Sequence, residues 1–322
     1  MSEFENNPQQ DDEEEKSRIE EKLKRARETY PLISPIAAAF LGLIGGFFLY
    51  QFVGGALTLV IFGFDLESAS VDGLRLMTMA GEILFILLPA LLFARWIYGD
   101  VSDVISVKIP SWIEVVLFSV GIIVLMPLLQ SYLYIQNFII ERLAANVGII
   151  NSIKTVFDSL NDMVEKTYGN LLAAHNIPEM ILVVIAVSIV PAVCEEVMFR
   201  GYIQKSFQFK LKPFRAAFIT AIFFSLYHFN PYGFFPLAAL GLYLGFAAYL
   251  SESLVVPIVL HFLNNFGAVL LYFIVGNDEL INSDVTNAEG MQSNIFIFVI
   301  LIFLFTLVIF AIKKYYSKIR NA

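Results

Sequence analysis

The sequence predicts an all-α, polytopic membrane protein with about eight transmembrane helices. Hydrophobic residues make up 58% of the 322 residues and charged residues only 16%, whereas a soluble domain is about half apolar and about a quarter charged. The apolar residues fall into runs close to the ~20 residues that cross a bilayer as a helix. Prolines, glycines and charges that end helices separate these runs.

Eight apolar stretches qualify as spanning helices. They are Ile36–Phe62, Met77–Tyr98, Trp112–Ile135, Met180–Arg200, Phe214–His228, Phe234–Leu250, Leu254–Val275 and Ile295–Ile312. The fifth is short and stops at Asn230-Pro231-Tyr232-Gly233, a strong helix breaker. At membrane depth such a break is tolerated only where protein buries it or where it lines a wet cavity.

The chain divides around these helices into four parts. Their expected bounds are 1–33 for a charged cytosolic segment, 34–177 for three helices and an amphipathic connection, 178–275 for the four helices of the core, and 276–322 for an acidic loop, the last helix and a basic tail. The lack of apolar periodicity in residues 1–12 predicts disorder, and the charged helix formers of residues 13–30 predict a solvated helix at the membrane surface. We expect no signal peptide, because the first apolar run comes late and follows a partly acidic region.

Lysine and arginine predict the orientation in the membrane. With eight helices, the basic N-terminal segment, residues 205–215 and the tail after Lys313 fall on one side. The opposite side holds only Arg75, Arg142, Lys154 and Lys166. Both termini are therefore expected in the cytoplasm, and a bacterial inner membrane fits best. Between Asn137 and Asn176, on the other side, we expect amphipathic helices lying on the membrane.

The composition also limits the possible partners. No basic face lies outside the lipid boundary, so a nucleic-acid partner is excluded and the bilayer is the expected surroundings. The single cysteine, Cys194, excludes an intrachain disulfide.

Ionisable residues in the apolar runs mark the candidate site, because each costs roughly 2.5–3.5 kcal/mol at the centre of a bilayer. Three pairs have the i, i+4 spacing that puts both members on one helix face. They are Glu196 with Arg200, Phe224 with His228, and His261 with Asn265. Glu195 lies about 100° round the helix from Glu196 and has no cation at helical spacing.

Depth along the helices indicates that these groups share one cavity. Counting ~1.5 Å per residue from the cytoplasmic ends, Glu195 lies ~8 Å deep, His228 ~13 Å and His261 ~12 Å. A carboxylate facing an imidazole binds and deprotonates a water, while a second imidazole and an amide donate to an oxyanion. Alternatively, Glu195, His228 and His261 form the ligand set of a hydrolytic Zn²⁺ site with an open position. Both interpretations end in hydrolysis of a carbonyl compound.

In this order on separate helices, the motifs resemble the signatures of a known family. They read Glu195-Glu196-x-x-x-Arg200, Phe224-x-x-x-His228 and His261-x-x-x-Asn265. They are similar to those of the CPBP intramembrane proteases, which include the CAAX prenyl endoproteases and bacterial proteins named for bacteriocin processing, immunity or abortive infection. The resemblance covers about residues 178–275 and implies a catalytic core on the fourth to seventh helices.

The resemblance also implies a role for each carboxylate. Glu195 matches the catalytic glutamate of the family, which activates water together with His228. Glu196 matches the second glutamate, which pairs with Arg200 and orients the site.

The third motif and the substrate follow from the same resemblance. His261 and Asn265 match the residues that stabilise the oxyanion. The implied activity is that of an intramembrane endopeptidase acting on a membrane-associated protein or a peptide, either a CAAX-type C-terminal segment or a bacteriocin-like peptide. The family is often called metalloprotease, so Zn²⁺ on Glu195, His228 and His261 is the expected cofactor if a metal binds.

Two other hypotheses remain open from the residues alone. A membrane scaffold or a bacteriocin self-immunity protein would keep the same cluster as structural polar contacts, with Glu196 and Arg200 as an ion pair at a helix end. A proton-coupled transporter is the third hypothesis, because chains of carboxylates and histidines also serve pumps.

Overall fold

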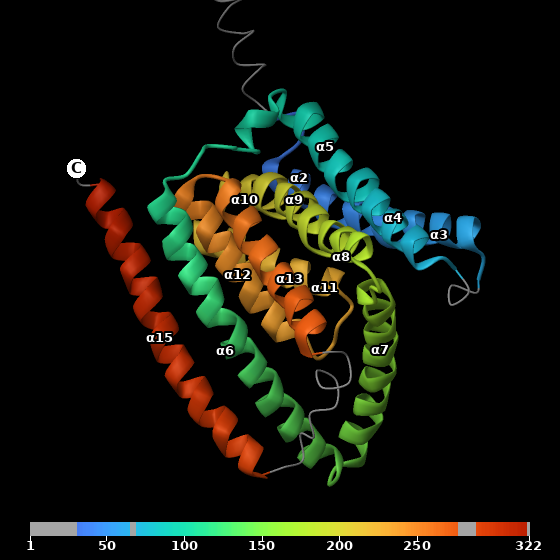
Figure 1. Cartoon of the computed structure of the whole chain (residues 1–322). Helices are drawn as coiled ribbons and strands as arrows, with labels where there is room; N and C mark the ends of the chain where they lie inside the picture. The colour runs from blue at the N-terminus through green and yellow to red at the C-terminus, as the bar shows by residue number, and fades with distance from the viewer. Residues whose placement is uncertain (1–30, 65–68, 276–287, 321–322) are drawn as a thin grey trace, which may run out of the picture.

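The computed structural model describes residues 31–64, 69–275 and 288–320, and every regular element in these ranges is a helix (Figure 1). The α-helices are α2 (Pro35–Phe40), α3 (Gly55–Phe62), α4 (Val71–Gly81), α5 (Leu88–Tyr98), α6 (Trp112–Ala144), α7 (Gly148–Leu172), α8 (Ile177–Val183), α9 (Val190–Glu196), α10 (Gln204–Gln208), α11 (Pro213–Tyr227), α12 (Phe234–Ser251), α13 (Val255–Val275) and α15 (Ala288–Arg320). The predictions for residues 1–30 and for the loop at 276–287 lie outside the described residues.

Several of these helices join end to end through π-helical turns. The turns are η1 (Leu41–Gly45), η2 (Phe48–Gly54), η3 (Glu82–Leu87), η5 (Val184–Ile189) and η6 (Val197–Ile203). Three continuous helical segments result: Pro35–Phe62, Val71–Tyr98 and Ile177–Gln208. Such turns occur often at functional sites, and η6 begins directly after Glu196.

Seven helical segments in the described ranges are long and apolar enough to cross a membrane. The remaining expected helix, the fifth in chain order, is α11, which is apolar but has only 15 residues. At ~1.5 Å per residue α11 is ~22 Å long, so it ends before crossing the hydrocarbon core. The all-helical, multi-pass class predicted from the sequence is confirmed.

Local sequence signals mark the residues at which several of these helices begin. Ser111 and Glu114 form a capping box at the start of α6, each side chain bonding the backbone N–H of the other. Asn176 caps α8, and Pro213 occupies the first turn of α11, where a missing N–H costs nothing.

The connection between the third and fourth spanning segments differs from the prediction. Helix α6 continues to Ala144 instead of ending near Ile135, and α7 then forms one amphipathic helix of 25 residues. The buried guanidinium of Arg75 in α4 donates to the carbonyl oxygens of Leu171 and Ala173, at the end of α7. A cation at a helix C-terminus satisfies carbonyls that have no intrahelical partner, so Arg75 holds α7 against α4.

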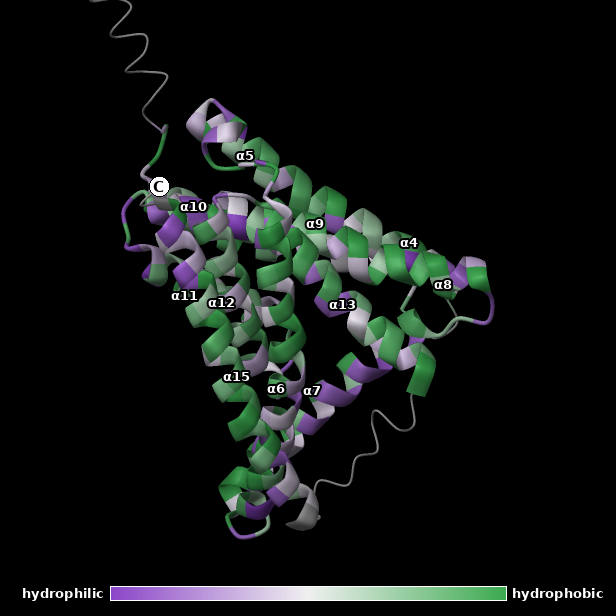
Figure 2. Ribbon diagram, turned by 60° about the vertical axis from the view of Figure 1, so that its left-hand side comes forward, coloured by the Kyte–Doolittle hydropathy of each residue, from purple (hydrophilic) through white to green (hydrophobic). Residues whose placement is uncertain are grey.

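The outer helices turn apolar side chains outward. On α15 the side chains of Phe296, Phe303 and Phe310 are each at least 63% exposed, and Figure 2 shows hydrophobic residues over most of α15 and α6, which run side by side. An apolar surface of this extent is expected where lipid surrounds the helices.

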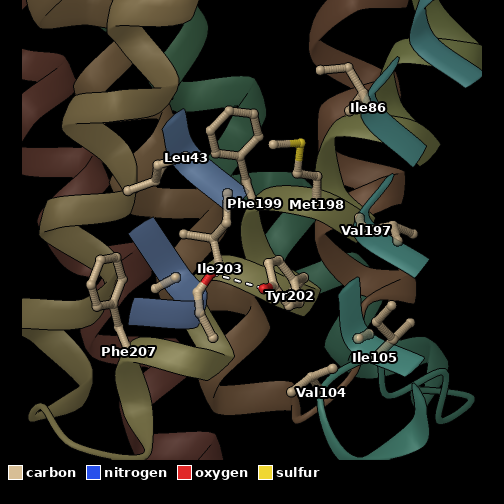
Figure 3. Packing of buried hydrophobic residues seen from close by; sticks show 14 of the residues in the cluster. Leu43, Ile86, Val104, Ile105, Val197, Met198, Phe199, Tyr202, Ile203 and Phe207 are labelled. Atoms are coloured by element: carbon tan, nitrogen blue, oxygen red, sulfur yellow. Dashed lines mark hydrogen bonds between the residues drawn. The ribbon is translucent and has the colours of Figure 1, made fainter. Parts of the chain in front are cut away.

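The interior contains two hydrophobic clusters. One gathers around η6, where Met198, Phe199 and Ile203 pack with Leu43 and Ile86 of the first two helical segments (Figure 3). The Tyr202 hydroxyl donates to the carbonyl of Ala38 over 2.8 Å, so its polar end is satisfied. The other cluster joins α6, α12, α13 and α15. The segment after Glu196 is thus packed inside the first cluster, which fixes the direction of the motif side chains.

Candidate active site

The second glutamate and the arginine of the first motif form a fully buried ion pair. Nη1 of Arg200 donates to Oε1 of Glu196 over 2.8 Å, and neither side chain is exposed. Nη2 of Arg200 donates to the carbonyl of Gly241 in α12 over 3.1 Å. The predicted pairing is therefore present, and Arg200 also ties η6 to α12.

His261 joins this ion pair from α13. Its Nδ1 lies 2.8 Å from the same oxygen, Oε1 of Glu196. A carboxylate oxygen accepts, so Nδ1 of His261 carries the proton and Nε2 is left for the site. The sequence prediction placed His261 with Asn265 at an oxyanion and did not anticipate its contact with Glu196, which no spacing along the chain reveals.

His228 follows the last residue of α11, at the expected helix break. Its Nδ1 lies 2.8 Å from the carbonyl oxygen of Phe224, so Nδ1 carries the proton and Nε2 has a free lone pair. The preceding carbonyl, of Tyr227, accepts from Nε2 of Gln51 over 3.0 Å. Phe229 then takes φ 48°, a left-handed conformation in which a side chain is uncommon. The backbone on both sides of His228 is thus fixed.

The ring of Phe224 brings the two histidines and the arginine together. Phe224 is completely buried. The guanidinium carbon of Arg200 lies 4.4 Å from the ring centroid, and the rings of His228 and His261 have centroids 4.7 Å and 5.9 Å away. A cation over an aromatic face is stabilised by about 0.5–2 kcal/mol. Phe224 is therefore the packing centre of the site, a larger role than the shielding of a pocket.

Asn265 lies one helical turn beyond His261, and its side-chain amide makes two hydrogen bonds within the protein. Its Nδ2 donates to the carbonyl of Val187 in η5 over 3.1 Å, and its Oδ1 accepts from Asn264. An amide nitrogen has two protons, so one N–H of Asn265 remains for a ligand.

Glu195 occupies a different face of the helix, as predicted. Its Oε2 is buried and has no hydrogen-bond partner among the described residues. It interacts electrostatically with Arg200, which places it beside the ion pair. Within the described part of the chain no hydrogen bond joins Glu195 directly to either histidine. That Glu195 and His228 share one water stays a prediction.

The sequence analysis missed two polar residues that interact with Glu195, namely Glu82 and Tyr50. The carboxylate of Glu82, in η3, interacts electrostatically with Glu195 and with Tyr50. The signal was available, because Glu82 lies inside an apolar run predicted to span the membrane and an acid there is a candidate functional residue.

The described residues do not present a ready ligand set for a metal. No group of three His, Cys, Asp or Glu side chains among them converges closely enough to hold an ion. Nδ1 of each motif histidine is already used, which leaves one nitrogen on each ring. Zn²⁺ on Glu195, His228 and His261 stays a prediction that would need these side chains to move together, and no reaction step is derived through it.

Two cavities differ in character. A groove of about 800 Å³ lies among α6, α11, α12 and α15 and is lined almost entirely by apolar residues, none of them a motif residue. A smaller cavity of about 400 Å³ lies among η2, α4 and α7, with Tyr50, Gln51 and Thr78 in its wall. The smaller cavity lies near Glu82, because Gly81, the residue before it, and Tyr50, which interacts electrostatically with Glu82, both line the cavity.

Comparison with known proteins gives one match. Residues 177–267 match the family model described as type II CAAX prenyl endopeptidase Rce1-like. All three motifs fall within this range, and the predicted resemblance is confirmed over it. The match covers less than half of the chain. Neither the curated proteins nor the solved structures contain a match to this chain.

Proposed function

We propose that this chain, whose residues 177–267 belong to the Rce1-like family of type II CAAX prenyl endopeptidases, is an intramembrane endopeptidase that hydrolyses a peptide bond with a Glu195-activated water. The observation that carries the proposal is the buried arrangement around Phe224, which unites Arg200, His228 and His261 from three helices. A polar cluster of this kind is expensive inside a membrane and is expected where chemistry occurs.

The first step uses the two groups that have free acceptor atoms. Glu195 is the general base, and Nε2 of His228 accepts a hydrogen bond from the same water and orients it. As the water oxygen bonds to the scissile carbonyl carbon, one water proton passes to Glu195 and the carbonyl π electrons move to oxygen.

The second step needs donors for the oxyanion and a proton for the leaving amine. Asn265 offers its remaining N–H, and His261 donates from Nε2 as an imidazolium whose other N–H, at Nδ1, contacts Oε1 of Glu196. The proton on Glu195 then passes to the nitrogen as the C–N bond breaks, which restores the base. Arg200 holds Glu196 in place throughout.

The family match supports a substrate at or in the membrane. We propose a C-terminal segment next to a lipidated cysteine, or a secreted bacteriocin-like peptide, with both termini of the chain in the cytoplasm of a bacterium. A farnesylated quenched peptide and the same peptide without the lipid separate these substrates, because only the first class requires the lipid for cleavage.

The deciding experiment is cleavage by single variants in detergent or proteoliposomes. Glu195→Gln and His228→Gln should each lower kcat by about 10²–10⁴-fold, the usual contribution of acid–base catalysis, with unchanged thermal unfolding. His175→Gln is the matched control, because His175 is exposed and lies outside the three motifs. Full cleavage by Glu195→Gln would refute the mechanism.

The complete burial of the Glu196–Arg200 pair also suits a non-catalytic scaffold or immunity protein. That function predicts biological activity in cells carrying Glu195→Gln or His228→Gln, since neither residue holds the ion pair together. Metal content by mass spectrometry on purified, active protein would test the Zn²⁺ prediction independently.

A further inference from the structure

The second spanning segment carries a buried carboxylate outside the three signature motifs. Glu82 is only 4% exposed, and its Oε2 has no hydrogen-bond partner among the described residues. An acid inside the bilayer costs roughly 2.5–3.5 kcal/mol on insertion scales, and an unpartnered buried oxygen adds to that cost. A residue kept at this cost is expected to have a function.

The neighbour of Glu82 is the proposed base. Segment η3, which begins with Glu82, packs against α9, which carries Glu195. The two carboxylates interact electrostatically, and Oε2 of each is buried without a partner in the described part of the chain. Two carboxylates that interact in this way repel, and either a proton held by one of them or a hydrogen-bond donor between them relieves the repulsion.

Tyr50 and the smaller cavity complete the surroundings. Tyr50 interacts electrostatically with Glu82 and with Glu195. Tyr50 lines the 400 Å³ cavity, as does Gly81, the residue before Glu82. Tyr168 of α7 also interacts electrostatically with both carboxylates. The pair therefore lies near a cavity that is large enough to hold water, although neither carboxylate lines it.

We propose that Glu82 is a positioning residue for Glu195 and that the two buried Oε2 atoms bind one bridging water between them. The bridging water donates one O–H to each carboxylate, which satisfies both oxygens and fixes the rotamer of Glu195. Oε1 of Glu195 is then directed at the attacking water, a separate molecule held by His228. Tyr50 holds Glu82 in turn. This inference rests on the proposed function, because it assigns Glu195 as the base.

The test compares two replacements of Glu82. Glu82→Leu removes the acceptor, so kcat should fall by about 10²-fold, the effect of a displaced catalytic group, while KM stays unchanged. The same variant should unfold at an equal or higher temperature, because an apolar side chain replaces a buried acid and removes its desolvation cost. Glu82→Gln should recover most of the lost kcat, since its amide oxygen still accepts from the bridging water, which donates its other O–H to Oε2 of Glu195.

Thr78→Val is the matched control, because Thr78 lines the same cavity and its hydroxyl bonds only within its own helix. A purely structural Glu82 would give parallel losses of unfolding temperature and kcat in both variants, and that result would overturn the inference. An unchanged kcat in Glu82→Leu would overturn it as well. If Glu195→Gln is inactive while Glu82→Leu is fully active, only this inference fails. If Glu195→Gln is fully active, the proposed function fails.

Discussion

Nδ1 of His261 and Nη1 of Arg200 contact the same oxygen, Oε1 of Glu196, each at 2.8 Å. One carboxylate oxygen thus joins α13 to η6, although 65 positions separate Glu196 from His261. The contact fixes the tautomer of His261 and neutralises Arg200 where no solvent reaches. The second glutamate of the motif therefore has two tasks, orienting a histidine and compensating a buried cation.

The first prediction concerns this shared carboxylate. Glu196→Ala leaves the buried Arg200 without its counter-charge, which costs about 3–5 kcal/mol. The variant should therefore lose both thermal stability and cleavage activity, measured by fluorescence-detected unfolding and by peptide hydrolysis.

A double variant separates the two tasks. Glu196→Met with Arg200→Met replaces the pair by apolar side chains of similar length, so stability should return close to the wild-type value. Activity should stay low, because His261 has lost the carboxylate that orients it. Recovery of activity along with stability would show that Glu196 acts on the fold alone.

The second prediction concerns His261. His261→Gln keeps an amide donor for Glu196, so unfolding should change by less than about 1 kcal/mol. The Nε2 position is lost, and kcat should fall by about 10²–10³-fold, the effect of removing one oxyanion donor. Equal kcat in wild type and His261→Gln would remove His261 from the chemistry.

Local patterns in the sequence predicted the helices and the motif residues. Apolar runs located the spanning segments, and i, i+4 spacing identified the Glu196–Arg200 pair, because both depend on residues near each other along the chain. The contact between His261 and Glu196, and the position of Phe224 among three charged or polar groups, depend on how α9, α11 and α13 pack. No local spacing reports that packing, so these contacts required the structure.

The length of α6 illustrates the same limit. The expected end near Ile135 followed from bilayer thickness, yet the helix continues to Ala144. Residues after Ile135 include Gln136, whose amide donates to the carbonyl of Tyr232 over 2.9 Å. A contact with another segment stabilises the extra turns, and hydropathy alone does not detect it. Glu82 was visible in the sequence but had no motif to single it out.

The third prediction tests the close packing of α11 and α12 at the site. A Cβ on Gly241 would lie 3.2 Å from the backbone Cα of Ala221 and 3.2 Å from Cδ1 of Phe224. Gly241→Ala should therefore push Phe224 and Arg200 out of position, at a cost of about 1–3 kcal/mol in stability and with a marked loss of kcat.

Gly55→Ala is the matched control, since no atom lies within 4 Å of the Cβ it would add at that helical position. That variant should be as stable as wild type or more stable by up to about 1 kcal/mol, with normal activity. Normal activity in Gly241→Ala would mean that the Phe224 packing is not needed for turnover.

The fourth prediction uses the link between α7 and the loop after His228. Tyr232 in that loop donates to Oδ1 of Asp158 over 2.6 Å, and Nζ of Lys154 lies 2.8 Å from Oδ2 of Asp158. Partial burial alone would raise the pKa of Asp158, but the hydrogen bonds from Lys154 and Tyr232 outweigh it and hold the pKa below its ordinary value of 3.8. Because the carboxyl pKa is lower in the folded state, ionised Asp158 stabilises the contact at pH values above its ordinary pKa. This stabilisation is lost as the pH falls through the lowered pKa.

The contact between α7 and the loop should therefore be complete at neutral pH and should loosen below about pH 4. Hydrogen exchange of residues 228–233, measured between pH 5 and pH 3 and corrected for the intrinsic pH dependence of exchange, should show this loosening in the wild type. Asp158→Asn should show weaker protection at pH 5 and no further change on acidification, because it has no proton to gain. Tyr232→Phe should behave in the same direction with a smaller effect, since Lys154 still holds Asp158. If acidification loosens wild type and Asp158→Asn equally, the pH response lies elsewhere and Asp158 does not control the position of the loop that carries His228.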